Sequence, residues 1–143
     1  MKVVKSKLNL LNRELGVLEF NRRVLALAQN LKTPLLERLK YVCIVASNLD
    51  EFFEIRIAVL KEQLRKNPKS KTQDGLIVGE FYLSILKETQ TLVSHKYKIF
   101  QRDILPNLER EGVHLHFENA WTPSQYRWAK NYFEKELSPL LTP

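Results

Sequence analysis

Along residues 76–105, apolar residues recur in neighbouring pairs, and successive pairs lie seven positions apart. The pairs are Ile85 with Leu86, Leu92 with Val93, and Ile99 with Phe100. A repeat of seven returns to the same side of an α-helix, so it predicts a seam that packs against other helices at a shallow angle. Pro106 and then Gly112 follow the repeat and are typical of a helix end. The sequence therefore predicts a long helix over about 76–105.

Further helices are expected before the long one. Apolar residues at helical spacing predict a first helix over about 15–30. Thr33 as N-cap and Pro34 in the first helical position predict the start of a second, and a third is expected over about 49–66. Pro68 and Gly75 mark the loop that follows. The predicted fold class is mainly α: an antiparallel bundle of about four helices, one of them long.

The pattern changes after Gly112. Residues 113–117, "VHLHF", alternate in polarity and predict a short strand. Thr122 and Pro123 then predict the start of a further helix. A single strand has no partner within the chain, which is unusual for a finished domain. We therefore expect an N-terminal helical domain over 1–112, and over 113–143 the first strand and helix of a second, truncated domain.

Charge and composition indicate which class of partner the protein binds and in which cell compartment it works. A net charge of +7 favours an anionic partner such as a nucleotide, polyphosphate, nucleic acid or an acidic membrane face. The single cysteine, Cys43, excludes an internal disulfide, and its apolar surroundings "YVCIVA" predict a buried thiol. No apolar run is long enough to span a membrane, and the first residues lack the core of a signal peptide. We expect a cytoplasmic protein, with association with a membrane face as the alternative.

Residue patterns that support catalysis are scarce. The chain has no glycine-rich phosphate loop. His114 and His116 share one face of the expected strand, but further ligands at suitable spacing are missing, so no metal site is predicted. Cys43 has no base beside it. We therefore expect no catalytic residue and no metal ligand in this chain, and the absence of a nucleic-acid-binding motif makes nucleic acid an unlikely partner.

Asn48 lies in a stretch that allows two interpretations. In "VASNLDEFFEIRIAVL", Asn48 and Glu51 have the spacing of a capping box, and so do Ser47 and Asp50. Acidic residues at a helix start also complement the helix dipole. On local grounds, capping at the start of the third helix is favoured. The alternative is that the carboxamide of Asn48 binds a ligand.

Two long segments carry a resemblance to a known family. They are "LNRELGVLEFNRRVLALAQN" at 11–30 and "PLLERLKYVCIVASNLDEFFEIRIAVLKEQL" at 34–64. In this order and at this separation they resemble the N-terminal domain of polyphosphate kinases. The later "GVHLHF" and "YFEKELSPLLTP" fit the entry to the next domain less distinctively. The chain departs from the family at Gly16 and Val17, where Ser-Trp is usual.

The resemblance implies a specific function. Enzymes of this family reversibly transfer the terminal phosphate of ATP to inorganic polyphosphate and release ADP, through a phosphohistidine and with Mg²⁺. Their catalytic histidine, phosphate-binding arginines and magnesium site lie in later domains, so we expect this chain alone to be inactive. The N-terminal domain covers the nucleotide site, and the Asn of "NLDEFF", here Asn48, contacts ATP. The family works as an oligomer, commonly a dimer.

The chemistry of Asn48 agrees with this implication. A carboxamide offers donors and an acceptor side by side, which matches the amino group and ring nitrogens at an adenine edge. Asp50 and Glu51 are anions, so we expect them to cap the helix and to hold Arg56 or Arg38 rather than approach phosphates. Two other functions stay open: a stand-alone basic helical module that binds polyphosphate or nucleic acid, and an oligomerisation domain.

Overall fold

The computed structural model describes residues 12–72, 75–116 and 121–141, and these residues are mainly helical. The predicted mainly α class is therefore confirmed. The chain divides into two compact units, Met1–Asn107 and Leu108–Pro143.

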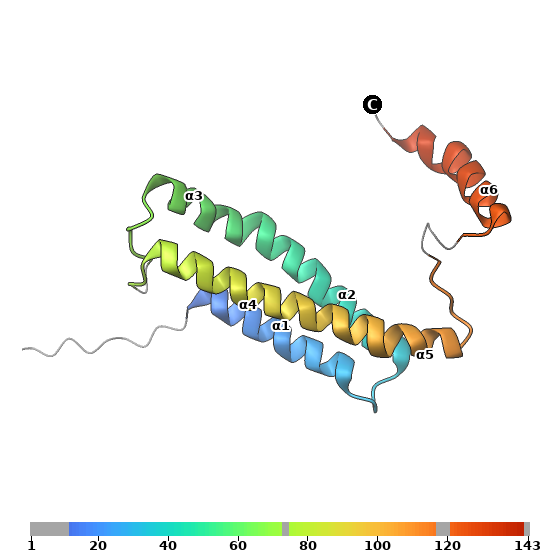
Figure 1. The fold of residues 1–143 in the computed structure, drawn as a ribbon, viewed down its shortest axis with the longest axis horizontal. Coiled ribbons are helices and arrows are strands. Elements are labelled where there is room, and N and C mark those ends of the chain that lie inside the picture. Colours follow the sequence, from blue (N-terminus) through green and yellow to red (C-terminus); the bar gives the residue numbers. More distant parts are fainter. Residues whose placement is uncertain (1–11, 73–74, 117–120, 142–143) are drawn as a thin grey trace, which may run out of the picture. The chain divides into compact units, whose positions relative to one another are not determined.

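Three helical rods make up the described part of the first unit. The first is α1 (Arg13–Gln29), and the second runs through α2 (Leu35–Glu51), the π-helix η1 (Phe52–Ile57) and α3 (Ala58–Lys66). The third comprises α4 (Val78–Ile99) and the π-helix η2 (Phe100–Ile104), and continues into α5 (Leu105–Arg110). Helix α1 packs against α2 and α4, and α4 also packs against α3, so the three rods lie side by side (Figure 1).

The expected break between a second and a third helix is absent. The backbone N–H of Phe52 donates to the carbonyls of Asn48 and Leu49, so helical hydrogen bonding continues past the polar residues. Asn48 is therefore a residue of the helix interior, and the predicted capping boxes at Ser47 and Asn48 are wrong. The physical reason is that neither glycine nor proline interrupts this stretch, and its acidic side chains point to solvent while Leu49 stays in the core.

Two π-helical segments, η1 and η2, change the spacing of buried residues along their rods. Buried positions normally follow each other at three or four residues, but here the interval is five from Phe52 to Ile57 and again from Ile99 to Ile104. A π turn contains one more residue than an α turn, so the buried stripe stays on one face of the rod. In this way a sequence out of step with the α repeat still buries a continuous stripe.

Proline explains where one of these segments lies. Pro106 has no N–H, and its ring would clash with the carbonyl four residues earlier in a regular α-helix. Instead the N–H of Leu105 bonds to the carbonyl of Phe100, five residues back, and the helix continues to Arg110. The expectation that Pro106 would end the long helix is therefore wrong. A third π segment, η4 (Phe133–Leu137), likewise ends two residues before a proline.

The core of the first unit follows the apolar seams. The predicted heptad positions Ile85, Leu92 and Ile99 are 0–5% exposed, which confirms the seam of the long helix. Leu18, Leu25 and Ala28 of α1 and Val42, Val45 and Leu49 of α2 complete the interior. Cys43 is exposed, which corrects its predicted burial, because the core-facing stripe of α2 passes through its neighbour Val42 and not through the whole apolar run.

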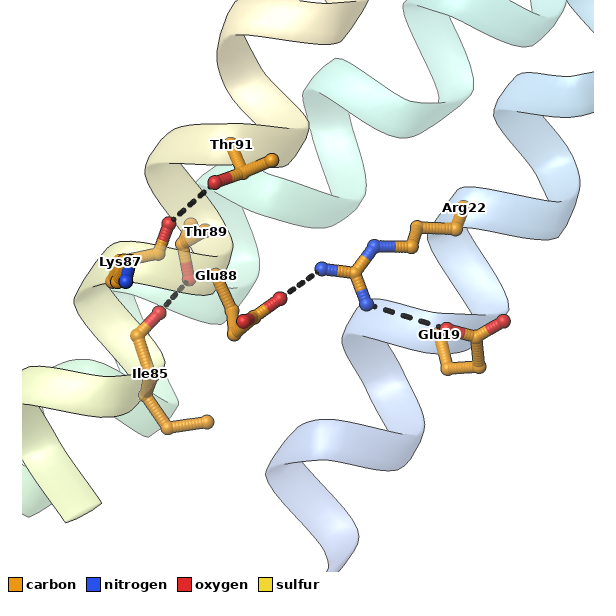
Figure 2. A network of polar contacts seen from close by, with 7 residues as sticks. All are labelled: Glu19, Arg22, Ile85, Lys87, Glu88, Thr89 and Thr91. Carbon is orange, nitrogen blue, oxygen red and sulfur yellow. Dashed lines mark hydrogen bonds and ion pairs between the residues drawn. The ribbon is translucent and has the colours of Figure 1, made fainter.

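Ion pairs join the rods at two levels. Arg22 on α1 reaches Glu88 on α4 and also pairs with Glu19 one turn away (Figure 2). Burial lowers the pKa of Arg22, but its hydrogen bonds to Glu88 and Glu19 outweigh burial, and the net shift is upward. Arg38, which is 4% exposed, donates from Nε to the carbonyl of Ala28 at 2.6 Å and pairs with Asp103 of η2. Arg38 is therefore structural and is not held by Asp50 or Glu51.

The second unit begins with the end of α5. Gly112 has φ +79° and its N–H bonds to the carbonyl of Glu109, while the N–H of Val113 bonds to the carbonyl of Leu108. This pair of hydrogen bonds is a Schellman motif, which favours glycine at this position. Residues 113–116 are irregular, so the strand predicted from them is not formed in the described part, and Phe117 lies outside it. Alternating polarity alone does not make a strand, because a strand needs a partner for its backbone hydrogen bonds.

The last described helix begins as the sequence predicts. Thr122 caps α6 (Pro123–Tyr132) in a capping box with Gln125, and Pro123 occupies the first turn. The rings of Trp128 and Tyr132 stack with centroids 5.4 Å apart. The short 3₁₀ turn η5 (Ser138–Leu140) ends the described chain shortly after η4.

Candidate functional site

A small pocket lies where α1 meets the junction of α2 and η1. It has a volume of about 240 Å³ and combines aromatic, amide and charged side chains. Its lining residues are Val17, Phe20, Asn21, Asn48, Glu51, Phe52, Ile55 and Arg56. Complete sites for small molecules typically enclose about 300–1,000 Å³. The pocket therefore fits one part of a ligand, such as a nucleobase, better than a whole nucleotide.

Asn48 is held in this pocket by a second asparagine. Its Nδ2 donates to Oδ1 of Asn21 at 2.8 Å. Asn21 is 1% exposed, and its own Nδ2 donates to the backbone carbonyl of Val17 at 2.9 Å. The structure thus places Asn48, the one ligand contact that the sequence predicts, at the edge of a hollow and in contact with α1.

Two charged side chains and two phenylalanine rings complete the lining of the pocket. Arg56 is partly buried, and among the described residues it has no carboxylate partner. Glu51 is exposed on the α2 side of the same pocket. Phe52 is 2% exposed and contributes an aromatic edge, whereas Phe20 is 51% exposed. The pocket therefore offers an amide, an unpaired cation and an exposed aromatic ring within one small area.

The helix η1 places these groups. Phe52, Ile55 and Arg56 all belong to the π segment, and π segments often occur at functional sites because they turn side chains out of the α register. Had the rod continued as a regular α-helix from Phe52, the positions after it would have been rotated relative to the core. The same extra residue that preserves the buried stripe thus also decides which side chains face α1.

A larger hollow elsewhere on the first unit is a poorer candidate. It has a volume of about 580 Å³, but all of its lining residues come from η1 and α3. It is therefore the exposed side of a single helix. One of its polar residues, Glu62, is already paired with Arg65 and Lys66.

The sequence did not predict several of the residues that line the small pocket beside α1. Asn21, Phe20 and Arg56 were not recognised as part of a site. A signal for Asn21 was present, because it lies three residues after Leu18 and four before Leu25, on the core-facing stripe of α1. A polar residue at such a position needs a hydrogen-bond partner, which here is Asn48.

Other expectations concern metals and membranes. Among residues 12–72, 75–116 and 121–141, no group of three or more His, Cys, Asp and Glu side chains could hold a metal ion. The rings of His114 and His116 have centroids 6.3 Å apart. In the same described ranges, none of the helices combines the length and hydrophobicity that crossing a bilayer requires.

Known proteins provide an independent comparison. Residues 10–116 match the model of the polyphosphate kinase N-terminal domain. The polyphosphate kinase of Burkholderia multivorans is 49% identical over 134 residues, which is 94% of this chain and 20% of the relative. The polyphosphate kinase of Paraburkholderia phytofirmans is also 49% identical, with the same coverage. The chain thus spans about a fifth of the length of these curated relatives.

A solved structure agrees with the sequence comparison. The crystal structure of polyphosphate kinase from Porphyromonas gingivalis superposes with a TM-score of 0.69 and 29% identity. The match covers 92% of this chain and 18% of that chain. Fold and sequence therefore lead to the same group of proteins.

Proposed function

Since this chain belongs to the polyphosphate kinase family, we propose that it is the nucleotide-covering N-terminal domain of an enzyme that reversibly transfers the terminal phosphate of ATP to inorganic polyphosphate. Its residues 10–116 correspond to the family's N-terminal domain. ATP, ADP and polyphosphate are then the ligands of the complete enzyme. Asn48 is the residue of this chain that contacts ATP.

The observation that carries this proposal is the position of Asn48 in the small pocket beside α1. The pocket is of the size of a nucleobase rather than of a whole nucleotide, as expected for a domain that covers one end of ATP. A carboxamide can bond the polar edge of a base. Arg56, without a carboxylate partner in the described chain, adds a charged hydrogen-bond donor to a pocket that Glu51 also lines.

The rest of the reaction is assigned to other parts of the enzyme. We propose that phosphate transfer proceeds through a phosphorylated histidine and with Mg²⁺, and that this histidine and the magnesium ligands lie outside this chain. We assign no magnesium ligand to this chain. Residues 1–112 are then the covering domain, and residues 113–143 lead into the next one. An oligomeric enzyme and a cytoplasmic location stay predictions.

A chimaeric enzyme tests the proposal. In the polyphosphate kinase of Burkholderia multivorans, this chain replaces the 134 residues that it matches. The chimaera should form polyphosphate from ATP, and Asn48→Ala should raise KM for ATP about tenfold, the effect of one good hydrogen bond. Gln90→Ala, which removes an exposed carboxamide from α4, is the matched control and should leave KM unchanged.

Two results would contradict the proposal. An inactive chimaera that is folded and has normal stability would show that this chain is not a working N-terminal domain. Equal KM values for the native and Asn48→Ala chimaeras would show that Asn48 does not contact ATP. Binding of polyphosphate to the chain alone that weakens steeply with salt and ignores Asn48→Ala would favour the basic-module function instead.

A further inference from the structure

The hydrogen bonds around Asn48 determine which way its carboxamide faces. The backbone carbonyl of Val17 can only accept a hydrogen bond, so the group of Asn21 that meets it must be the NH₂ group. Oxygen Oδ1 of Asn21 therefore faces Asn48. Because that oxygen also can only accept, Asn48 must present its own NH₂ group to Asn21. The orientation of both amides thus follows from one backbone carbonyl.

The free end of Asn48 is consequently an acceptor. Among the described residues, Oδ1 of Asn48 has no hydrogen-bond donor, and Asn48 lines the pocket. Rotating the amide by half a turn would bring two oxygens together at Asn21 and would lose the 2.8 Å bond. Asn21 is 1% exposed, so water cannot easily replace that bond. The pocket therefore presents an oriented carbonyl oxygen rather than an amide that can turn to suit its ligand.

We propose that Asn21 is a positioning residue that makes the pocket selective for a base with an exocyclic amino group, adenine, over a base with an oxo group at the same position. This inference rests on the proposed function, in which Asn48 contacts ATP. The 6-amino group of adenine donates a hydrogen bond, whereas the 6-oxo group of guanine or hypoxanthine only accepts. An oxo group opposite Oδ1 of Asn48 leaves two acceptors facing each other. The preference for adenine is thus determined by Asn21 of α1, which contacts Asn48 and not the base itself.

The first test uses the 143-residue chain without ligand. Solvent exchange of the Asn48 side-chain amide is measured by NMR and compared with that of Asn30, an exposed asparagine. In the native chain, the Asn48 amide should exchange at least about tenfold more slowly than that of Asn30. In Asn21→Leu, which keeps the size but removes the acceptor, the two rates should become similar. Equal rates already in the native chain would overturn the inference.

The second test measures nucleotide selectivity in the chimaeric kinase. The ratio of kcat/KM for ATP to that for ITP should be about ten or more in the native chimaera, as expected when a hydrogen-bonding site meets a mismatched group. Asn21→Leu should bring this ratio close to one, mainly through KM for ATP.

A control separates positioning from stability. Thr89→Val also removes a buried polar group, because Thr89 is 0% exposed and its hydroxyl donates to the carbonyl of Ile85, but Thr89 does not line the pocket (Figure 2). This variant should leave the ATP/ITP ratio unchanged. If Asn48→Ala raises KM while Asn21→Leu leaves the ratio unchanged, the proposed function stands and this inference fails. An ATP/ITP ratio near one in the native chimaera would also refute the inference, and this measurement does not depend on the folding of any variant.

Discussion

Removing Asp103 should destabilise the first unit more than removing the arginine that it pairs with. Arg38 is 4% exposed, and its guanidinium depends on the carbonyl of Ala28 and on the carboxylate of Asp103. Asp103→Ala leaves that buried cation without a counter-ion, which typically costs 3–5 kcal/mol. Because the side chain of Asp103 is 36% exposed, water can reach the guanidinium of Arg38 in the variant. We therefore expect the free energy of unfolding to fall by about 3 kcal/mol, the low end of that range.

The reverse change should be milder. Arg38→Met removes the charge and keeps much of the apolar stem, so nothing charged stays buried. The carboxylate of Asp103 keeps its contact with water and a 3.0 Å hydrogen bond from Nδ2 of Asn107. The main loss is the bond to the carbonyl of Ala28, about 1 kcal/mol. The double variant should consequently be more stable than Asp103→Ala alone.

Urea unfolding followed by circular dichroism at 222 nm measures these free energies, with the slope of the transition as a check that the unfolded state is unchanged. The predicted order of stability is native, then Arg38→Met, then Asp103→Ala. A loss below about 0.5 kcal/mol for Asp103→Ala, or a larger loss for Arg38→Met, would refute the view that a buried cation governs this contact.

Three further predictions concern the core, a helix end and a surface ion pair. Ile85→Ala, at a position 0% exposed, should cost about 3 kcal/mol, while Leu83→Ala, 68% exposed on the same helix, should cost under about 0.5 kcal/mol in the same urea assay. Gly112→Ala should cost about 1 kcal/mol and raise amide exchange at the end of α5, because φ there is +79°; an unchanged exchange rate would contradict the strain argument. The hydrogen bond from Arg65, and secondarily that from Lys66, lowers the pKa of Glu62, so its NMR titration should have a midpoint below the usual glutamate range. The stabilisation from this pair is present above the unfolded pKa and is lost as pH falls through the folded pKa, and Arg65→Ala should move the midpoint upward.

The heptad seam and the cap of α6 were readable from the sequence. The predicted cap of α2 is wrong: Pro34, whose ψ is 144°, is the N-cap residue instead of Thr33, and no side chain caps this helix. Ile85, Leu92 and Ile99 are buried as the repeat predicts, and Thr122 caps α6 as expected. These features are local: a helical face needs only its own spacing, and a capping threonine needs only the residues that follow it. Local spacing was thus sufficient for these two features, but not for the capping boxes predicted at Ser47 and Asn48 or for the burial of Cys43.

Asn48 shows the limit of local patterns. The spacing of Asn48 and Glu51 fits a capping box, yet a cap also requires the preceding helix to end, and nothing in the sequence ends it. The π segment that follows is also hard to foresee, because its benefit comes from burial against other helices. The five-residue interval between Phe52 and Ile57 was visible but could not be distinguished from a gap in a regular stripe.

The candidate site depended on contacts between distant segments. Asn48 was found through the family resemblance, whereas its partner Asn21 lies 27 residues away and is joined to it only by the packing of α1 on α2. The same holds for Arg38, which was expected near the acidic residues of its own helix and instead pairs with Asp103, 65 residues away. Polar residues on core-facing stripes, such as Asn21 and Arg38, were the signal that the sequence reasoning did not use.

The most direct test of the central claim is a structure of the chimaeric kinase with a non-hydrolysable ATP analogue. We predict that Oδ1 of Asn48 lies within hydrogen-bond distance, about 3 Å, of the amino group of adenine, with Asn21 still accepting from Nδ2 of Asn48. If adenine is bound and no atom of this chain contacts it, the chain does not cover the nucleotide, and the proposed role of Asn48 is wrong.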